Sequence, residues 1–418
     1  MKLSGQILAK INPEIVKQLC EIAPLVAKKD SSLWPLEQET INRLGWIDLP
    51  TKSRALLPEL DALSAWTRSN GLTEIVLCGM GGSSLAPEVI ASTYKKSLTI
   101  LDSTDPVQVN NSVPSDLNKA VIVISSKSGT TIETLSQYEF YVGKFKQANL
   151  NPTEHIVIVT DPGTPLDVIA RNEGYKVVNA DPNVGGRFSA LSAFGLVPAA
   201  LIGVDISLLL DDAEKLSPSL SSMDSPAIKI AAILFSLSDQ VINFCDKNST
   251  TPGLSYWIEQ LIAESTGKNS NGRLPVVIEE STESFSGITV GFTPGSYDLT
   301  IEATLGEQFL LWEWVTALLC FLLKVNPFNQ PNVAEAKDRT STILSSLTNN
   351  GVNTPTPTYE DSDYLIFSSQ KISNLSEFLK LKVSYFAILA YLDRGSDGEL
   401  LKIRELVAAK SKTATTFG

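Results

Sequence analysis

The segment VISSKSGTTIETL, residues 123–135, gathers six hydroxyl side chains around one lysine and one glycine. The apolar run before it predicts a buried strand, and Thr131 predicts the start of a helix with the appearance of a capping box. The turn between them consists of Ser126, Lys127, Ser128, Gly129, Thr130 and Thr131. Hydroxyls beside the amides of a helix start suit an oxyanion such as a phosphomonoester, with Lys127 contributing its main-chain N–H. A Ser/Thr-capped helix that binds nothing is the alternative.

A second loop, GMGGSSLAP at residues 79–87, also leaves an apolar run and enters a helical pattern. Its glycines allow close backbone approach to a ligand at Gly82 and Ser83. The spacing differs from GxGxxG, and Asp102 is the one acidic candidate for a ribose contact, so a nucleotide site is disfavoured. A tight turn needed only for packing is the other alternative. Because the carboxyl ends of successive parallel strands face one crevice, the two loops together predict a phosphate site.

The elements that must position these loops follow an α/β pattern. Residues 1–70 predict helices. From residue 71, β-rich runs alternate with amphipathic helical segments, which predicts a parallel sheet covered on both faces. The predicted strands are 74–78, 97–101, 120–125, 155–160 and 175–179, and then 274–280, 287–292 and 297–303. Residues 206–270, including AIKIAAILFSLSDQVINFC, predict mainly helix. We expect a helical segment over 1–70 and two α/β lobes, 71–205 and 206–418, the second with a C-terminal extension.

Composition limits the class of protein. The chain has 418 residues, 43% of them hydrophobic, a net charge of −12 and a pI of about 4.8. This charge argues against a nucleic-acid partner and requires a local positive site for any anionic ligand. Four scattered cysteines and one histidine predict no metal site and suit a reducing, cytoplasmic compartment. We expect no signal sequence and no membrane span, and the helical segment FLLWEWVTALLCFLL is compatible with a core or with an interface.

Five sequence blocks occur in an order that resembles the phosphoglucose isomerase family. They are GMGGSSLAP, SSKSGTTIET, VGGRFSALSAFGLVPAAL, IEQLIAESTGK and NQPNVAEAK, spanning about residues 75–340. The resemblance is nearest to the isomerase part of transaldolase/phosphoglucose isomerase fusions. It implies two sugar-isomerase-type lobes, each a mainly parallel sheet flanked by helices in three layers. It also implies that no cofactor is needed, that the chain forms a homodimer, and that a transaldolase is fused or associated.

The resemblance assigns roles to individual residues. It implies that Gly82 and Ser83 touch the sugar, and that the 6-phosphate is held by Ser126, the Lys127 main chain, Ser128 and Thr131. Arg187 would lie beside the reacting C1 and C2 oxygens, Glu264 would be the base, and Lys337 would assist ring opening, with Gln330 nearby. Taken alone, Glu264 and Lys337 are ordinary residues of charged helix faces, and Arg187 is an ordinary partner for a surface carboxylate.

The family's ring-opening histidine is missing from the corresponding segment, VVIEESTESFSGITVGFTPG. His155 stands at the start of an apolar run, so we expect it to lie at the edge of a strand. Two explanations stay open: the chain is an isomerase part whose ring-opening group is absent or replaced, or Lys337 and water open the ring. The leading hypothesis is an isomerase of glucose 6-phosphate and fructose 6-phosphate. The alternatives are a sugar-phosphate-binding protein with weak or no catalysis, and the same fold acting on mannose 6-phosphate or an amino sugar.

Overall fold

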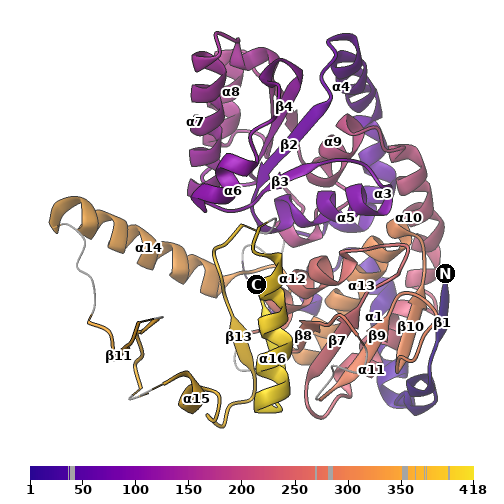
Figure 1. The fold of residues 1–418 in the computed structure, drawn as a ribbon. Helices are drawn as coiled ribbons and strands as arrows, with labels where there is room; N and C mark the ends of the chain where they lie inside the picture. The colour runs from indigo at the N-terminus through magenta and orange to yellow at the C-terminus, as the bar shows by residue number, and fades with distance from the viewer. Residues whose placement is uncertain are drawn as a thin grey trace.

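The computed structural model describes residues 1–35, 37, 43–268, 271–280, 286–350, 356–362, 364–370, 372, 374–393 and 396–418. Two α/β lobes lie one above the other (Figure 1). The sheet of the first lobe has the order β3-β2-β4-β5-β6, and each neighbouring pair is parallel. Its strands are β2 (Glu74–Gly79), β3 (Thr99–Leu101), β4 (Ala120–Ser125), β5 (Ile156–Thr160) and β6 (Lys176–Asn179). The five strands predicted for this lobe are therefore confirmed.

The strand order of the first sheet creates a switch point between β2 and β4. The chain leaves β2 toward β3 on one side, and the later strands add on the other side through β4. Ligands of open α/β sheets bind outside the carboxyl ends of the strands at such a point. The loops that follow β2 and β4 are GMGGSS and SSKSGTT, so the fold brings the two predicted loops together.

Both faces of the first sheet are covered. Along β4, Val121 and Val123 join one core, whereas Ile122 and Ile124 join the other, as expected from the alternation of side chains along a strand. The helices of this region are α3 (Leu49–Lys52), α4 (Leu57–Ser69), α5 (Leu85–Thr93), α6 (Pro106–Asn111), α7 (Ile132–Gln147), α8 (Pro165–Glu173) and α9 (Ala193–Leu201). Helix α9 packs on β5 and β2 from one side and α7 on β4 and β2 from the other, giving the predicted three layers.

The second lobe repeats this arrangement. Its sheet has the order β8-β7-β9-β10-β1, parallel except for β1, which pairs antiparallel with β10. The strands are β1 (Lys2–Ser4), β7 (Val241–Cys245), β8 (Leu274–Val277), β9 (Ile288–Gly291) and β10 (Leu299–Glu302). Its helices are α1 (Pro13–Ala27), α10 (Ile206–Leu220), α11 (Pro226–Phe235), α12 (Leu254–Thr266) and α13 (Leu305–Leu323). The mixed α/β class with two flanked sheets is therefore confirmed.

Two sequence expectations differ from the structure. The helical prediction through VINFC is wrong, because α11 ends at Phe235 and Val241–Cys245 forms β7, which lies between β8 and β9 in the sheet. A polar break, SLSDQ, separates the two, and Gln240 adopts a φ of 63°, which a continuing helix does not permit. The first residues of the chain form strand β1 rather than part of a helix. The division into 1–70, 71–205 and 206–418 stays a prediction. Helices of the first segment contact both lobes, because α1 packs on α11 and α4 packs on α9.

Helix α13 lies in the core of the second lobe. It is the one helix within the described ranges that is long and apolar enough to cross a membrane, and 94% of its most apolar window is buried inside the protein. It packs against α10, α11 and α12. From the sequence, the apolar segment FLLWEWVTALLCFLL was compatible with a core or with an interface. In the structure it is a core helix.

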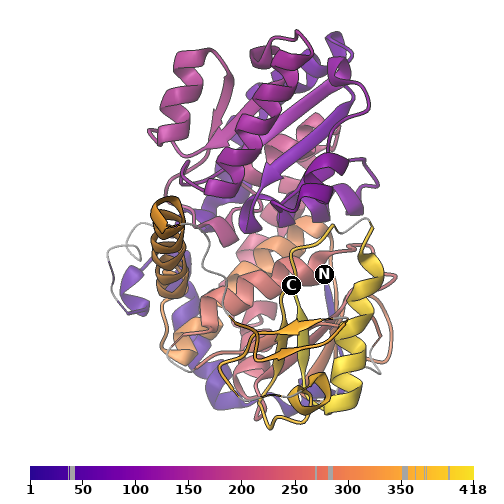
Figure 2. The same cartoon turned by 60° about the vertical axis from the view of Figure 1, so that its left-hand side comes forward.

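The C-terminal region contributes an outer layer and one projecting helix. Its elements are α14 (Pro331–Asn350), β11 (Tyr359–Glu360), β12 (Leu365–Ile366), α15 (Leu375–Phe378), β13 (Phe386–Ile388), α16 (Lys402–Ser411) and β14 (Thr415–Phe417). Ala414 packs with Val241 and Val276, so the chain end covers one face of the second sheet. Helix α14 instead extends away from both lobes in Figure 1, and Figure 2 shows its long axis beside the junction of the lobes.

Candidate active site

A cavity of about 1060 Å³ lies where the two lobes meet. It is lined by the loops after β2 and β4, by the end of α12, by the connection between α13 and α14, and by the start of α14. The predicted site residues that line it are Gly82, Ser83, Lys127, Ser128, Thr131, Arg187, Glu264, Gln330 and Lys337. Ser126 lies beneath this surface and is 2% exposed. The fold thus gathers residues that are up to 255 positions apart (82 to 337) around one space.

Gly82 allows the loop after β2 and the turn that carries Arg187 to approach at main-chain distance. A Cβ at position 82 would lie 2.4 Å from the carbonyl oxygen of Gly186, so no larger residue fits without displacement. The Ser189 hydroxyl donates to the same Gly186 oxygen at 2.6 Å and fixes the turn that precedes it. Because Arg187 follows directly, this contact sets the position of its guanidinium relative to the glycine loop.

The hydroxyl-rich turn holds itself together. The Ser126 hydroxyl donates to the Thr131 hydroxyl oxygen at 3.2 Å, and Gly129 adopts a φ of +63° that favours glycine. Thr131 is the N-cap residue of α7, but its side chain makes no capping bond. The predicted capping box is therefore wrong: position 134 is a threonine, and the Thr131 oxygen accepts from Ser126 instead. The start of a 16-residue helix consequently faces the cavity, which favours an anion there.

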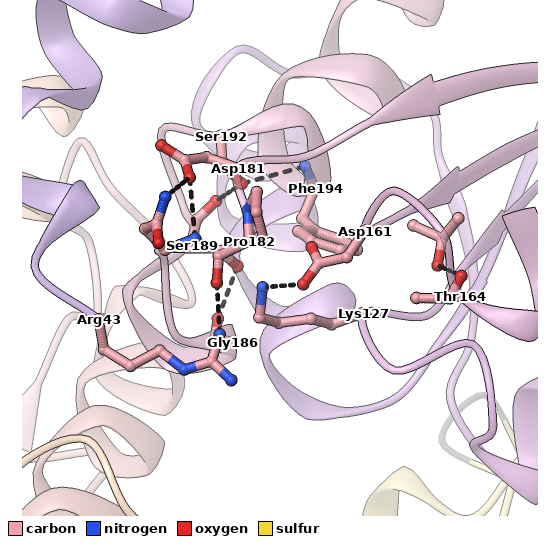
Figure 3. Close-up of polar contacts among 12 residues, drawn as sticks. Arg43, Lys127, Asp161, Thr164, Asp181, Pro182, Gly186, Ser189, Ser192 and Phe194 are labelled. Carbon is pink, nitrogen blue, oxygen red and sulfur yellow. Dashed lines mark hydrogen bonds and ion pairs between the residues drawn. The ribbon is translucent and has the colours of Figure 1, made fainter. Parts of the chain in front are cut away.

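Lys127 is paired with Asp161, a residue that the sequence analysis missed (Figure 3). The ammonium donates to Asp161 Oδ2 at 2.5 Å, and both side chains are largely buried. Burial lowers the pKa of Lys127 and raises the pKa of Asp161, and the mutual attraction opposes both shifts. The ammonium is thereby tied to the end of β5. An acidic residue directly after the strand IVIVT is the sequence signal that could have indicated this partner.

Arg187 and Glu264 meet across the cavity floor. Arg187 is 3% exposed, and its Nε lies 3.6 Å from Glu264 Oε2. Its Nη2 donates to the main-chain oxygen of Asn329 at 3.0 Å. The other carboxylate oxygen of Glu264 accepts from the Gln260 amide at 2.8 Å. Because Gln260 and Glu264 are four residues apart on α12, they share the helix face that lines the cavity, while Trp257 and Leu261 face the core.

Lys268 is a second buried cation that sequence reasoning missed, although it ends the block IEQLIAESTGK. It is 7% exposed, and its ammonium donates to the main-chain oxygen of Asn326. Burial, assisted by the nearby charge of Arg187, lowers the pKa of Lys268 to about 8. Lys268 and Arg187 therefore both donate to main-chain oxygens of the connection between α13 and α14.

Gln330 ends that connection, and Lys337 follows it on α14. Gln330 precedes α14 and Lys337 lies on its second turn, exposed at the rim of the cavity. The side chains lining the cavity carry more positive than negative charge within the described residues. The cations are Arg43, Lys127, Arg187, Lys268, Lys324 and Lys337, and the anions are Glu37, Glu133, Asp161 and Glu264. This local balance contrasts with the net charge of −12 for the whole chain and satisfies the expectation of a local positive site.

His155 does not line the cavity. It is buried in the first lobe, where its Nδ1 lies 2.9 Å from the Ala120 carbonyl oxygen and its ring stacks on Phe145 at 4.8 Å. It directly precedes β5, at the end of the sheet opposite the cavity, so its role is structural. Of the segment in which the family's histidine was sought, residues 281–285 lie outside the described residues. Across the described positions, no three His, Cys, Asp or Glu residues gather in an arrangement that could hold a metal.

Comparison with solved structures places the chain among two-lobed α/β proteins with the sugar isomerase fold. A hypothetical protein from Thermus thermophilus superposes with a TM-score of 0.71 at 24% identity, covering 82% of this chain and 99% of that one. A glucose-6-phosphate isomerase from Chlamydia trachomatis superposes with a TM-score of 0.67 at 18% identity, covering 80% and 86%. At these identities the likeness concerns the fold.

The sequence comparisons define the family. The chain belongs to the phosphoglucose isomerase family, whose sequence profile matches residues 55–271. A probable glucose-6-phosphate isomerase from Haloarcula marismortui is 31% identical over 261 residues, covering 59% of this chain and 56% of that protein. A glucose-6-phosphate isomerase from Methanocaldococcus jannaschii is 29% identical over 308 residues, covering 69% and 73%. The chain thus spans little more than half the length of some curated relatives that it matches, such as the Haloarcula protein.

Proposed function

We propose that this protein is an aldose–ketose isomerase that interconverts glucose 6-phosphate and fructose 6-phosphate. The observation that carries the proposal is the pairing of Glu264 with Arg187 in a cavity that the hydroxyl-rich turn also lines. Membership of the phosphoglucose isomerase family supports a sugar-phosphate substrate. The relative from Methanocaldococcus jannaschii carries the name glucose-6-phosphate isomerase.

The first lobe would hold the phosphate. Ser128 and Thr131 face the cavity, Ser126 supports Thr131, and Lys127 offers its main-chain N–H while Asp161 holds its ammonium. Gly82 and Ser83 would contact the sugar. Fixing the phosphate end would place C1 and C2 at the opposite side of the cavity, so binding energy would be used for orientation.

Glu264 would then carry out the proton transfer. Its carboxylate would take the proton from C2 of the open-chain aldose and return it to C1, through a cis-enediol, and act in the opposite order for the ketose. The intermediate gains negative charge on its oxygens. Arg187 is suited to stabilise that charge, because its guanidinium stays protonated and is held by Asn329.

Ring opening would fall to Lys337 with water, and Gln330 would lie beside it at the rim. Both residues line the cavity, whereas His155 is buried elsewhere. Rings of sugar phosphates also open spontaneously in solution, so loss of one general acid lowers the rate without preventing turnover. General acid–base assistance is typically worth about 10²–10⁴-fold.

Incubation of the protein with fructose 6-phosphate in D₂O, followed by NMR, tests the proposal. We expect glucose 6-phosphate to accumulate with deuterium at C2, since a carboxylate base exchanges its proton with solvent. The Glu264→Gln variant should bind the sugar phosphate and produce no exchange. Turnover by Glu264→Gln at the wild-type rate would contradict the role of Glu264 as the base, and wild-type binding without turnover would favour the alternative, a sugar-phosphate-binding protein. Parallel reactions with mannose 6-phosphate and an amino sugar phosphate would define selectivity at C2.

The compartment, cofactor requirement and partners of the protein are predictions. The cysteines Cys20, Cys78, Cys245 and Cys320 are free thiols, which supports a reducing, cytoplasmic compartment. The proposed reaction requires no cofactor. A homodimer and a fused or associated transaldolase stay predictions from the family resemblance, and the oligomeric state is directly measurable by light scattering.

A further inference from the structure

Two buried cations from different lobes hold the same short loop. The loop, residues 324–330, joins α13 to α14. Arg187, which follows the first lobe's last strand, donates through Nη2 to the Asn329 oxygen at 3.0 Å. Lys268, which follows α12 of the second lobe, donates through Nζ to the Asn326 oxygen. Both acceptors are main-chain oxygens, so the contacts fix the path of the loop rather than one of its side chains.

Further contacts of the loop come from the N-terminal segment. The Asn329 amide donates to Glu37 Oε2 at 2.5 Å, and the Asn326 amide donates to the Pro35 oxygen at 3.4 Å. The Phe328 ring packs edge-on against Trp34, with the centroids 5.4 Å apart. The loop is therefore fixed at each end, and Gln330 follows its last anchored residue.

Helix α14 depends on this loop for its direction. Figure 1 shows the helix extending away from both lobes, and the residues of its first two turns line the cavity. Lys337 lies on those turns, and the described side chains of α14 are exposed. Because little packing elsewhere determines where α14 points, the anchors of residues 324–330 decide where Gln330 and Lys337 lie.

A lysine is a costly choice for an anchor at this position. Its ammonium is buried next to the Arg187 guanidinium, and burial together with that repulsion lowers the pKa of Lys268 to about 8. The other charged or titratable groups that act on it are Glu264 from α12, Glu37 from the N-terminal segment and Cys320 from α13. A neutral residue would avoid the desolvation of a charge. The presence of a charged side chain at this buried position therefore indicates a role beyond packing.

We propose that Lys268 is a positioning residue of the active site, whose ammonium holds the Asn326 carbonyl and thereby sets Gln330 and Lys337 at the rim of the cavity. This inference rests on the proposed function only where activity is the readout. The anchoring itself is a property of the free protein and is testable without a substrate.

Hydrogen–deuterium exchange tests the anchoring. Lys268→Met should increase exchange in peptides covering 324–337, whereas Lys268→Arg, which keeps a charged donor, should restore protection. Lys229→Met, on the surface of α11, is the matched control and should leave these peptides unchanged. In the wild type, exchange corrected for its intrinsic pH dependence should rise between pH 7 and pH 9, because deprotonation of Lys268 removes the charged donor. Equal protection in the wild type and Lys268→Met, at both pH values, would overturn the proposal.

The isomerase assay adds a readout that a purely structural role would not move. For the free wild-type protein, kcat/KM should fall as pH rises through about 8, since the protonated form of Lys268 is the anchoring form and its pKa is about 8. Lys268→Arg should abolish this alkaline decline. Lys268→Met should lower kcat/KM by roughly 10²-fold at pH 7, the scale of a misplacement near 1 Å. The thermal stability of Lys268→Met should equal that of the control variant Lys229→Met. Wild-type turnover with an unaffected Lys268→Met variant would refute the inference alone, and an inactive wild type with the expected exchange pattern would refute the isomerase proposal alone.

Discussion

The two lobes share one strand order and contribute different things to the cavity. In each sheet, the parallel strand that comes first in the chain lies between the second and the third. The resulting orders are β3-β2-β4 and β8-β7-β9. The first lobe lines the cavity with the loops at its switch point and with the turn that carries Arg187. The lining residues of the second lobe come instead from the end of α12 and from the connection between α13 and α14.

In the proposed mechanism, this difference separates binding from reaction. Loops at the ends of parallel strands present main-chain amides and short hydroxyls, which suit an anion that must be held but not altered. The end of α12 and the connection to α14 present carboxylate and ammonium groups, and Arg187 of the first lobe reaches Glu264 from the turn after β6. Such groups suit proton transfer and charge stabilisation. If this division is correct, substitutions in the two switch-point loops should change KM, and substitutions of the groups around Glu264 should change kcat.

The largest expected effect follows the substitution of Glu264, the proposed base. Glu264→Gln keeps the shape of the side chain and its contact with Gln260, but the amide cannot accept the proton from the sugar. We expect kcat to fall by about 10²–10⁴-fold with KM changed little, measured in a coupled assay for glucose 6-phosphate. Glu259→Gln, on the same helix and outside the cavity lining, is the control. Equal losses in both variants would indicate a defect of α12 rather than of catalysis.

Arg187→Lys should produce the next largest effect. Lysine keeps the charge, but it cannot bond Asn329 and face Glu264 with a planar, fixed group. Removal of one preorganised donor typically costs about 10²–10³-fold in kcat. Steady-state kinetics with both hexose phosphates would check this, and a variant with normal kcat and raised KM would assign Arg187 to binding, contrary to the role proposed for it beside Glu264.

Thr131→Ala tests the first lobe. It removes a cavity-facing hydroxyl and the acceptor of Ser126 without touching the second lobe. A hydrogen bond to a charged group is worth about 1.5–3 kcal/mol, so KM should rise roughly 10- to 100-fold while kcat changes little. Ser136→Ala, an exposed hydroxyl on the same helix that bonds Ile132, serves as the control. A fall in kcat with unchanged KM would place Thr131 in the reaction and break the division.

Asp161→Asn should have the smallest effect on turnover. Loss of the carboxylate leaves the largely buried ammonium of Lys127 without its charged partner, which we expect to lower the free energy of unfolding by about 1–3 kcal/mol. Thermal denaturation would measure this. The KM for fructose 6-phosphate should rise less than in Thr131→Ala, because Asp161 supports the turn indirectly. A larger rise in KM than in Thr131→Ala would show that Asp161 itself contacts the substrate.

The sequence predicted those parts of the fold that local patterns determine. Apolar runs bounded by polar turns identified every strand of the first sheet, and adjacent loops of parallel strands then had to share an edge. β7 was missed because its five residues follow a long apolar helix and are equally apolar. Asp161 and Lys268 were missed for another reason: their partners are 34 and 58 residues away, and no local pattern shows which ammonium will be buried against which oxygen.

The charge of the cavity has a consequence for the encounter between protein and ligand. A phosphate ester approaching a surface of net charge −12 is repelled on average, whereas the cavity mouth attracts it. Low-dielectric walls concentrate such a field, which guides diffusion toward one opening and away from the rest of the surface. Since the screening length is about 8 Å at physiological salt, this guidance acts only near the mouth. Selection among metabolites would thus begin before any contact forms, by the sign of their charge.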